Sequence, residues 1–90
     1  MAAPYAFIVF TSPSCRPCKS ALRVVREAAD QSGGIIEVHA VDSLERQDLA
    51  TSCNVRSLPT VFLVTASGRV LHRWTAVPPR HEISTYLRAA

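Results

Sequence analysis

Two cysteines, Cys15 and Cys18, lie two residues apart where an apolar run ends and a helical pattern begins. Residues i and i+3 at a helix N-terminus occupy neighbouring positions on one face, so the two sulfur atoms can close a small disulfide ring with little movement. The unpaired N–H groups and the positive dipole end of the helix favour thiolate over thiol, which lowers the pKa of the first cysteine. We therefore predict a dithiol in which Cys15 attacks a disulfide and Cys18 resolves the mixed disulfide.

Three neighbours of the cysteines are predicted to tune the pKa of Cys15. Arg16 and Lys19 add positive charge, although water and salt screen exposed charges, and Pro17 suits the first helical turn, where its missing N–H is not needed. A free thiol with a pKa of about 8.5 is only a few per cent ionised at pH 7. A pKa near 7 makes it about half ionised, a stabilisation of roughly 2 kcal/mol.

Length and composition predict a single domain over residues 1–90, with 48% hydrophobic residues for one modest core. The net charge is +3, but the ten lysines and arginines are scattered, so nucleic-acid binding is not expected. The N-terminus has no charged leader, and the apolar stretch from Ala6 to Phe10 is too short for a signal peptide or a membrane span. Three cysteines do not make a structural disulfide framework. We expect a cytoplasmic monomer that binds no membrane.

Hydrophobic periodicity predicts strands and helices in alternation. An unbroken apolar run typical of a central strand is followed by an amphipathic helix and a second strand, which together make a right-handed βαβ unit. A short helix, a hairpin of two strands and a last helix complete the chain. The predicted bounds are strands at Tyr5–Thr11, Ile35–Val41, Val61–Val64 and Val70–Trp74, and helices from Arg16 or Pro17 to about Ser32, from Asp42 to Asn54, and from Pro78-Pro79 onward. The order βαβ followed by αββα predicts an α/β fold with a four-stranded mixed sheet flanked by helices.

Local signals refine the second half. Asp42, three residues before Glu45, is predicted to cap the short helix. Asn54 is predicted to end that helix in the left-handed conformation, and Gly68 to supply a positive φ in the hairpin turn. The residues expected on the apolar sides of the two helices are Leu44, Leu49 and Ala50 in the short helix and Ile83, Tyr86, Leu87 and Ala90 in the last.

The chain resembles the thioredoxin family over nearly its whole length. Three stretches carry the resemblance in the family's order: Cys15-Arg16-Pro17-Cys18-Lys19, Val55-Arg56-Ser57-Leu58-Pro59-Thr60 and Ser67-Gly68. The resemblance implies a minimal thioredoxin-like fold and a protein-disulfide reductase that a flavin disulfide reductase or another thiol donor re-reduces. It implies no cofactor other than the redox-active disulfide.

The resemblance also assigns a substrate-binding surface. It implies that Pro59 is a cis-proline packed beside the dithiol, with an ordinary trans proline as the alternative, and that the backbone of Leu58 pairs with the bound substrate. The substrate-binding residues implied in this way are Ser14, Leu58, Pro59, Thr60 and Ala76.

Several positions depart from the family pattern. The chain is expected to begin at the family's second strand, and so to lack the first strand and helix. Ser14 stands where the family usually has tryptophan, Val9 where it has a buried aspartate, and Ala40 where it has a lysine. Arg16 and Ala76 each replace a glycine. Because Arg16 favours the thiolate, and hence the reduced form, we expect a potential more oxidising than that of a typical thioredoxin.

Two other functions stay open from the sequence alone. The chain could be a binding or scaffold module with little turnover, or Cys15 and Cys18 could hold zinc together with Cys53 or a histidine. Cys53 itself is expected to be a buried structural thiol, with regulatory oxidation as the alternative. Trp74 is expected in the core or at the sheet edge. The histidines expected on the surface are His39, His72 and His81.

Overall fold

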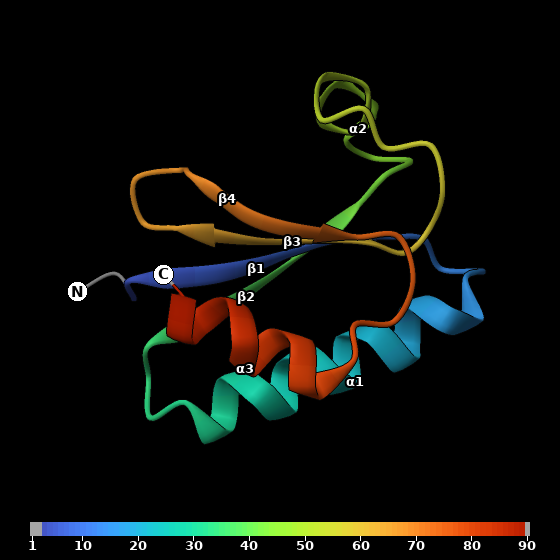
Figure 1. Cartoon of the computed structure of the whole chain (residues 1–90). Coiled ribbons are helices and arrows are strands. Elements are labelled where there is room, and N and C mark those ends of the chain that lie inside the picture. Colours follow the sequence, from blue (N-terminus) through green and yellow to red (C-terminus); the bar gives the residue numbers. More distant parts are fainter. Residues whose placement is uncertain (1–2, 90) are drawn as a thin grey trace.

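A computed structural model describes residues 3–89 and shows a four-stranded sheet with three helices (Figure 1). The elements in chain order are β1 (Tyr5–Thr11), α1 (Arg16–Gln31), β2 (Ile36–Asp42), α2 (Gln47–Ser52), β3 (Thr60–Thr65), β4 (Val70–Trp74) and α3 (Arg80–Ala89). The strand order is β2-β1-β3-β4, with β1 parallel to β2 and antiparallel to β3, and β4 antiparallel to β3. The predicted mixed sheet and the order βαβ followed by αββα are therefore confirmed.

Both long helices, α1 and α3, lie on one face of the sheet, and α2 lies on the opposite side (Figure 1). The core between the sheet and the two long helices follows from strand alternation, because every second residue of a strand points to the same face. Phe7 and Val9 of β1 lie beside Leu63 and Val61 of β3, and all four are fully buried. The other buried members of this core are Ala21, Val25, Ile36, Trp74 and Ile83.

The chain forms α1 over the predicted range because Ala21 and Val25 share one face, and both are fully buried. The helix ends where the N–H and the hydroxyl of Ser32 both donate to the Ala29 carbonyl, at 3.1 and 2.6 Å. Gly33 follows with a φ of +70°, which an L side chain rarely adopts.

The start of α2 differs from the prediction. The Asp42 carboxylate accepts hydrogen bonds from the N–H groups of Leu44 and Glu45, at 2.8 and 3.4 Å, but these cap a turn and the helix begins only at Gln47. In this turn the N–H and the hydroxyl of Ser43 both donate to the Thr11 carbonyl, at 2.9 and 3.1 Å, so Ser43 still pairs with the end of β1. Leu44 is 65% exposed, so its assignment to the apolar side of the helix was wrong.

The β3–β4 hairpin and the end of α2 follow the prediction. Gly68 has a φ of +89°, and its N–H donates to the Thr65 carbonyl at 2.9 Å. Asn54 has a φ of +56° directly after α2. Both residues therefore adopt the positive φ that their turns require.

An aromatic cluster joins β4 to α3. Trp74 is 7% exposed, as expected for a core residue, and its indole N–H donates to the Glu82 carboxylate at 3.1 Å. His72 stacks on Tyr86 with ring centroids 4.1 Å apart and meets Trp74 edge-on. His72 is therefore half-buried, which corrects its assignment to the surface. Ile83 of α3 is 2% exposed, Tyr86 and Leu87 are half-buried, and Ala90 lies outside the described residues.

Truncating Ile83 tests how strongly α3 depends on this core. Ile83→Ala is expected to lower the free energy of unfolding by about 2–5 kcal/mol, because it removes buried methyl groups and leaves a cavity. Urea unfolding followed by circular dichroism measures the loss. Ser84→Ala changes the exposed neighbour and should stay within about 0.5 kcal/mol of the parent. Equal losses in the two variants would contradict the buried position of Ile83.

Candidate active site

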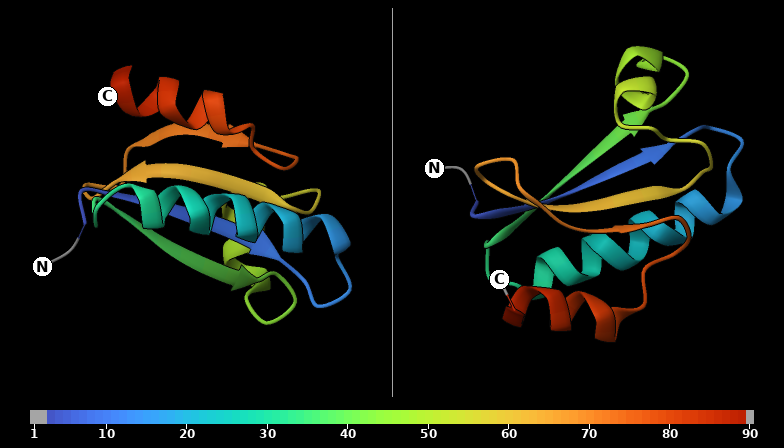
Figure 2. Two further views of the ribbon diagram at one scale, coloured as in Figure 1. Left: turned by 90° about the horizontal axis from the view of Figure 1, so that it is seen from below. Right: turned by 45° about the horizontal axis from the view of Figure 1, so that its top comes forward.

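Three loops lie together at one end of the sheet, where β1 and β4 end and β3 begins (Figure 2). Phe10, one residue before the end of β1, pairs with Thr60, the first residue of β3. Val61 of β3 pairs in turn with Trp74, the last residue of β4. The loop after β1 therefore lies beside the loop that enters β3 and the one that leaves β4, and the predicted site residues lie in these loops, in the first turn of α1 and at the start of β3.

Cys15 and Cys18 occupy the first of these loops and the start of α1. Their sulfur atoms are joined in a disulfide, and their Cα atoms lie 5.3 Å apart. Cys15 is the N-cap of α1, and its sulfur accepts a hydrogen bond from the Cys18 N–H at 3.2 Å. The Cys15 sulfur thus takes the place that a serine or aspartate oxygen usually fills at a helix N-cap.

The two cysteines differ sharply in exposure. Cys15 is half-buried, whereas Cys18 is 1% exposed. A disulfide of another protein can therefore approach the sulfur of Cys15 but not that of Cys18 while α1 keeps this conformation. This asymmetry is what an attacking and a resolving thiol require.

The charge around the cysteine pair is positive. Arg16 and Lys19 are exposed, as is Pro17, and the first turn of α1 contains no acidic residue. Positive charge at a helix N-terminus does not help the helix dipole, but it favours a thiolate there. Ser14 is also exposed beside the pair.

Shifted pKa values occur on other parts of the exposed surface. Hydrogen bonds from Arg46 are the main cause that lowers the pKa of Asp48, and they raise that of Arg46 itself. The N–H of Ala3 is the main cause that lowers the pKa of Glu37, with a smaller effect from His39.

The second loop carries the predicted proline. The Leu58–Pro59 peptide bond is cis, as the resemblance implied. Leu58 is half-buried and Pro59 is buried, whereas Ala76 in the third loop is exposed. Thr60 is fully buried, and its hydroxyl donates to the Ser57 carbonyl at 2.7 Å. Its side chain therefore fixes the loop from within, and the substrate-binding role expected of Thr60 stays a prediction.

Hydrocarbon side chains stand at the two positions where the resemblance leads one to expect an aspartate and a lysine. Val9 is fully buried, and its neighbour on β2 in the parallel register is Ala40. Within the described part of the chain, Thr60 is the only buried polar or charged residue. No buried carboxylate is therefore available there to take a proton from Cys18.

Cys53 and the histidines do not build a metal site. Cys53 is half-buried at the C-cap of α2, so the expectation of a buried thiol was wrong, while His39 and His81 are exposed. Among residues 3–89, no three histidine, cysteine or acidic groups gather closely enough to hold a metal ion. No helix in the same range is long and apolar enough to cross a membrane.

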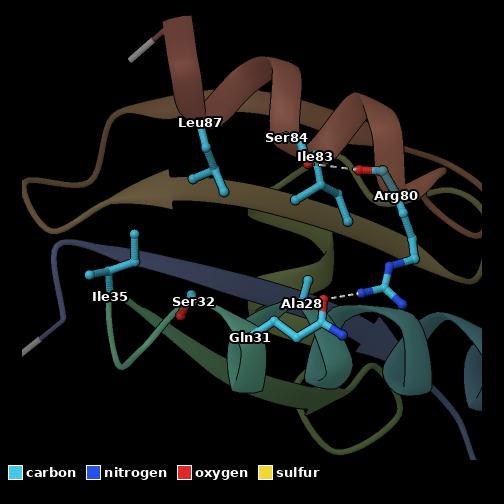
Figure 3. Close-up of a pocket in the computed structure, with 8 residues that line it drawn as sticks. All are labelled: Ala28, Gln31, Ser32, Ile35, Arg80, Ile83, Ser84 and Leu87. Carbon is cyan, nitrogen blue, oxygen red and sulfur yellow. Dashed lines mark hydrogen bonds between the residues drawn. The ribbon is translucent and has the colours of Figure 1, made fainter.

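A cavity of about 270 Å³ lies far from the cysteines, between the C-terminal half of α1 and α3 (Figure 3). Ile35, Ile83 and Leu87 line its apolar part. Arg80 crosses its mouth and donates to Glu27 and to Gln31 of α1. The cavity thus forms part of the α1–α3 contact, at the opposite end of α1 from the disulfide.

Comparison with known proteins gives the family. A family model described as Thioredoxin matches residues 2–89. The chain belongs to the thioredoxin family. A probable thioredoxin of Methanothermobacter thermautotrophicus is 32% identical over 75 residues, which cover 83% of this chain and 82% of that protein.

Other thioredoxin relatives are longer. The chloroplastic M-type thioredoxin of Spinacia oleracea is 40% identical over 69 residues, and the chloroplastic thioredoxin M3 of Oryza sativa is 32% identical over 82 residues. These matches cover 77% and 91% of this chain but only 38% and 45% of the two relatives. The chain therefore spans less than half the length of these two thioredoxins.

Solved thioredoxin structures show the same fold. A thioredoxin-2 described as a component of malaria parasite protein secretion machinery superposes with a TM-score of 0.86 at 20% identity, covering all of this chain and 86% of that one. Chloroplastic thioredoxin z superposes with a TM-score of 0.80 at 23% identity, covering 97% and 80%. At these identities the likeness concerns the fold alone.

Two residues that bind distant backbone carbonyls escaped the sequence analysis. Ser43 ties the turn after β2 to the end of β1, and Arg73 of β4 donates to the backbone carbonyls of Cys53 and Asn54. The only signal for Arg73 was its position, since it is a long cation inside a strand that is otherwise largely apolar. Nothing local in the sequence identifies its partners.

Alkylation of the reduced protein tests the difference between the cysteines. With limiting iodoacetamide we expect Cys15 to react first and Cys18 at least about tenfold more slowly, because labelling of a buried thiol requires local opening. Mass spectrometry of the peptides measures each rate. Cys53 is an internal reference, because it is also half-buried but follows a helix C-terminus. If Cys18 or Cys53 reacts as fast as Cys15, the assigned asymmetry is wrong.

Proposed function

We propose that this protein is a thiol–disulfide oxidoreductase that reduces protein disulfides through Cys15 and Cys18. The observation that carries the proposal is a disulfide whose accessible sulfur caps the N-terminus of a 16-residue helix while the other cysteine is buried. Membership of the thioredoxin family supports the same reaction class.

The reaction begins with the reduced protein. The Cys15 thiolate attacks one sulfur of the substrate disulfide, the substrate S–S bond breaks, and the other substrate sulfur leaves as a thiolate that takes a proton. Cys18 then loses its proton and attacks the Cys15 sulfur, which breaks the mixed disulfide and releases the second substrate thiolate. Two electrons pass from the dithiol to the substrate, and the protein is left with the Cys15–Cys18 disulfide.

Stabilisation of the Cys15 thiolate makes the first step fast. The Cys18 N–H already points at the Cys15 sulfur, and a thiolate accepts this bond more strongly than a neutral sulfur does. The dipole of α1 and the charges of Arg16 and Lys19 act in the same direction. Pro17 lies in the first turn of α1, where its missing N–H costs no intrahelical hydrogen bond.

We propose that the substrate lies across the three loops at this end of the sheet. Ser14 and Ala76 are exposed on either side of the Leu58–Pro59 turn. The Leu58 backbone is proposed to pair with an extended segment around the substrate disulfide, the way in which extended peptides commonly bind. Since Val9 replaces an acid, we propose that Cys18 transfers its proton to water.

A flavin disulfide reductase or another thiol donor is proposed to regenerate the dithiol. No cofactor other than the disulfide takes part in the cycle. The cytoplasmic location and the monomeric state stay predictions.

Insulin reduction tests the proposed reaction. With dithiothreitol as the donor, we expect the wild-type protein to speed the precipitation of reduced insulin. Cys15→Ser should abolish this effect because it removes the nucleophile. Pre-reduced Cys18→Ser, mixed with insulin after dithiothreitol is removed, should accumulate a mixed disulfide that mass spectrometry detects. Cys53→Ser is the matched control and should keep the wild-type rate. If wild-type protein neither reduces insulin nor forms the mixed disulfide, the chain is a scaffold instead.

The redox potential tests the role of Arg16. We expect a wild-type potential between about −270 and −180 mV in glutathione buffers at pH 7. Arg16→Gln should lower it by about 10–20 mV, or about 0.5–1 kcal/mol, since a lost cation destabilises the thiolate of the reduced form. Arg26→Gln removes an equally exposed charge farther along α1 and should leave the potential unchanged. Equal shifts in the two variants, or a wild-type potential clearly below about −270 mV, would contradict the role of Arg16.

A further inference from the structure

Arg73 of β4 binds the backbone at the exit of α2. Its Nη1 donates to the Cys53 carbonyl at 3.0 Å, and its Nη2 donates to the Asn54 carbonyl at 2.7 Å. Both bonds span about twenty residues of sequence, so they join two segments that nothing local holds together. A guanidinium suits this task because its donors are fixed in one plane, whereas an ammonium acts as a point charge.

The bound carbonyls lie just beyond those that the helix end satisfies. The Val55 N–H donates to the Ala50 carbonyl and the Asn54 N–H donates to the Thr51 carbonyl, at 2.8 and 3.0 Å, which is the Schellman pattern with Asn54 in the left-handed conformation. This pattern satisfies the carbonyls of Ala50 and Thr51 but not those of Cys53 and Asn54. Arg73 satisfies these two.

The segment that Arg73 holds leads directly into the Leu58–Pro59 turn. The far end of this segment is fixed by the buried hydroxyl of Thr60 on the Ser57 carbonyl. Arg73 therefore supplies the matching anchor at the near end. Between these anchors, Arg56 and Ser57 are exposed.

The same arginine connects this segment to the strand that precedes the cysteines. Its guanidinium carbon lies 5.2 Å from the centre of the Phe62 ring, which places the cation over the aromatic face. Phe62 meets Phe10 edge-on, with centroids 5.9 Å apart. Phe10 is fully packed and lies at the end of β1, just before the loop to Cys15.

We infer that Arg73 is a positioning residue that holds the Leu58–Pro59 turn at a fixed place relative to Cys15 for binding of an extended polypeptide. This inference rests on the proposed function, and it names a residue outside the three loops. A disulfide that needs the Leu58 backbone for binding depends on Arg73, whereas a small disulfide that reacts only at the Cys15 sulfur does not. The two substrate sizes therefore separate positioning from chemistry.

The test compares Arg73→Met with wild-type protein on two substrates. Methionine keeps an apolar stem over Phe62 but removes both donors. We expect KM for insulin to rise about tenfold, which corresponds to about 1.4 kcal/mol, with kcat and the rate of reduction of an aromatic disulfide dye within about twofold of wild type. The substitution should increase the hydrogen-exchange rates of the amides in residues 55–58 more than those of the amides in α1. Arg69→Met removes the same charge from the exposed hairpin turn. It should change neither the kinetics on the two substrates nor the hydrogen exchange of residues 55–58.

Each other outcome is decisive. Equal losses on insulin and on the dye, or an unchanged KM for insulin, would overturn the positioning role. Should Arg73→Met fail to fold, Arg73→Lys serves instead, and a wild-type KM in that variant would overturn the role because one ammonium cannot reproduce both bonds. Failure of the wild-type protein on both substrates would overturn the proposed function itself, and this inference with it.

Discussion

The hydrogen bond from the Cys18 N–H to the Cys15 sulfur is the interaction on which the site depends. It caps the start of α1 after β1, and it directs a first-turn donor at the sulfur atom that we propose as the attacking thiolate. Helix capping and sulfur chemistry therefore use the same backbone group. The core holds this arrangement in place, because Ala21 and Val25 fix α1 against Phe7 and Val9. An apolar face along one side of the helix thus determines where its reactive end lies.

Local patterns predicted most of this fold. The strand Tyr5–Thr11 and the helix after it follow from local hydrophobic patterns, which do not depend on distant partners. Asn54 and Gly68 adopt the positive φ that their residue types favour. The cysteine pair was predictable for the same reason. Wrong predictions occurred where distant partners decide the outcome. Ser43 binds Thr11 from a turn that the sequence predicted as helix, and His72 is covered by Tyr86 from a helix that follows it.

The three loops at the cysteine end of the sheet are held in place in two ways. Apolar packing places the strands, while polar side chains hold the loops: Thr60 binds the Ser57 carbonyl from inside, and Arg73 binds two carbonyls from the neighbouring strand. Sequence reasoning named the cysteine pair and the cis-proline, because their types and spacing are distinctive. It missed the residues that bind backbone carbonyls, because any carbonyl is an equally good acceptor and the sequence does not say which one comes near.

Trp74 gives the protein an intrinsic optical probe. It is the single tryptophan of the chain, it is shielded from water between β4 and α3, and its indole is bonded to Glu82. Emission from an indole shifts to longer wavelength when water reaches the ring. Fluorescence therefore reports on the surroundings of Trp74 without an added label. Trp74 is the last residue of β4, which ends at the same end of the sheet as the cysteines. Detachment of α3, or a change in the loops at this end of the sheet, would each shift the emission spectrum of Trp74.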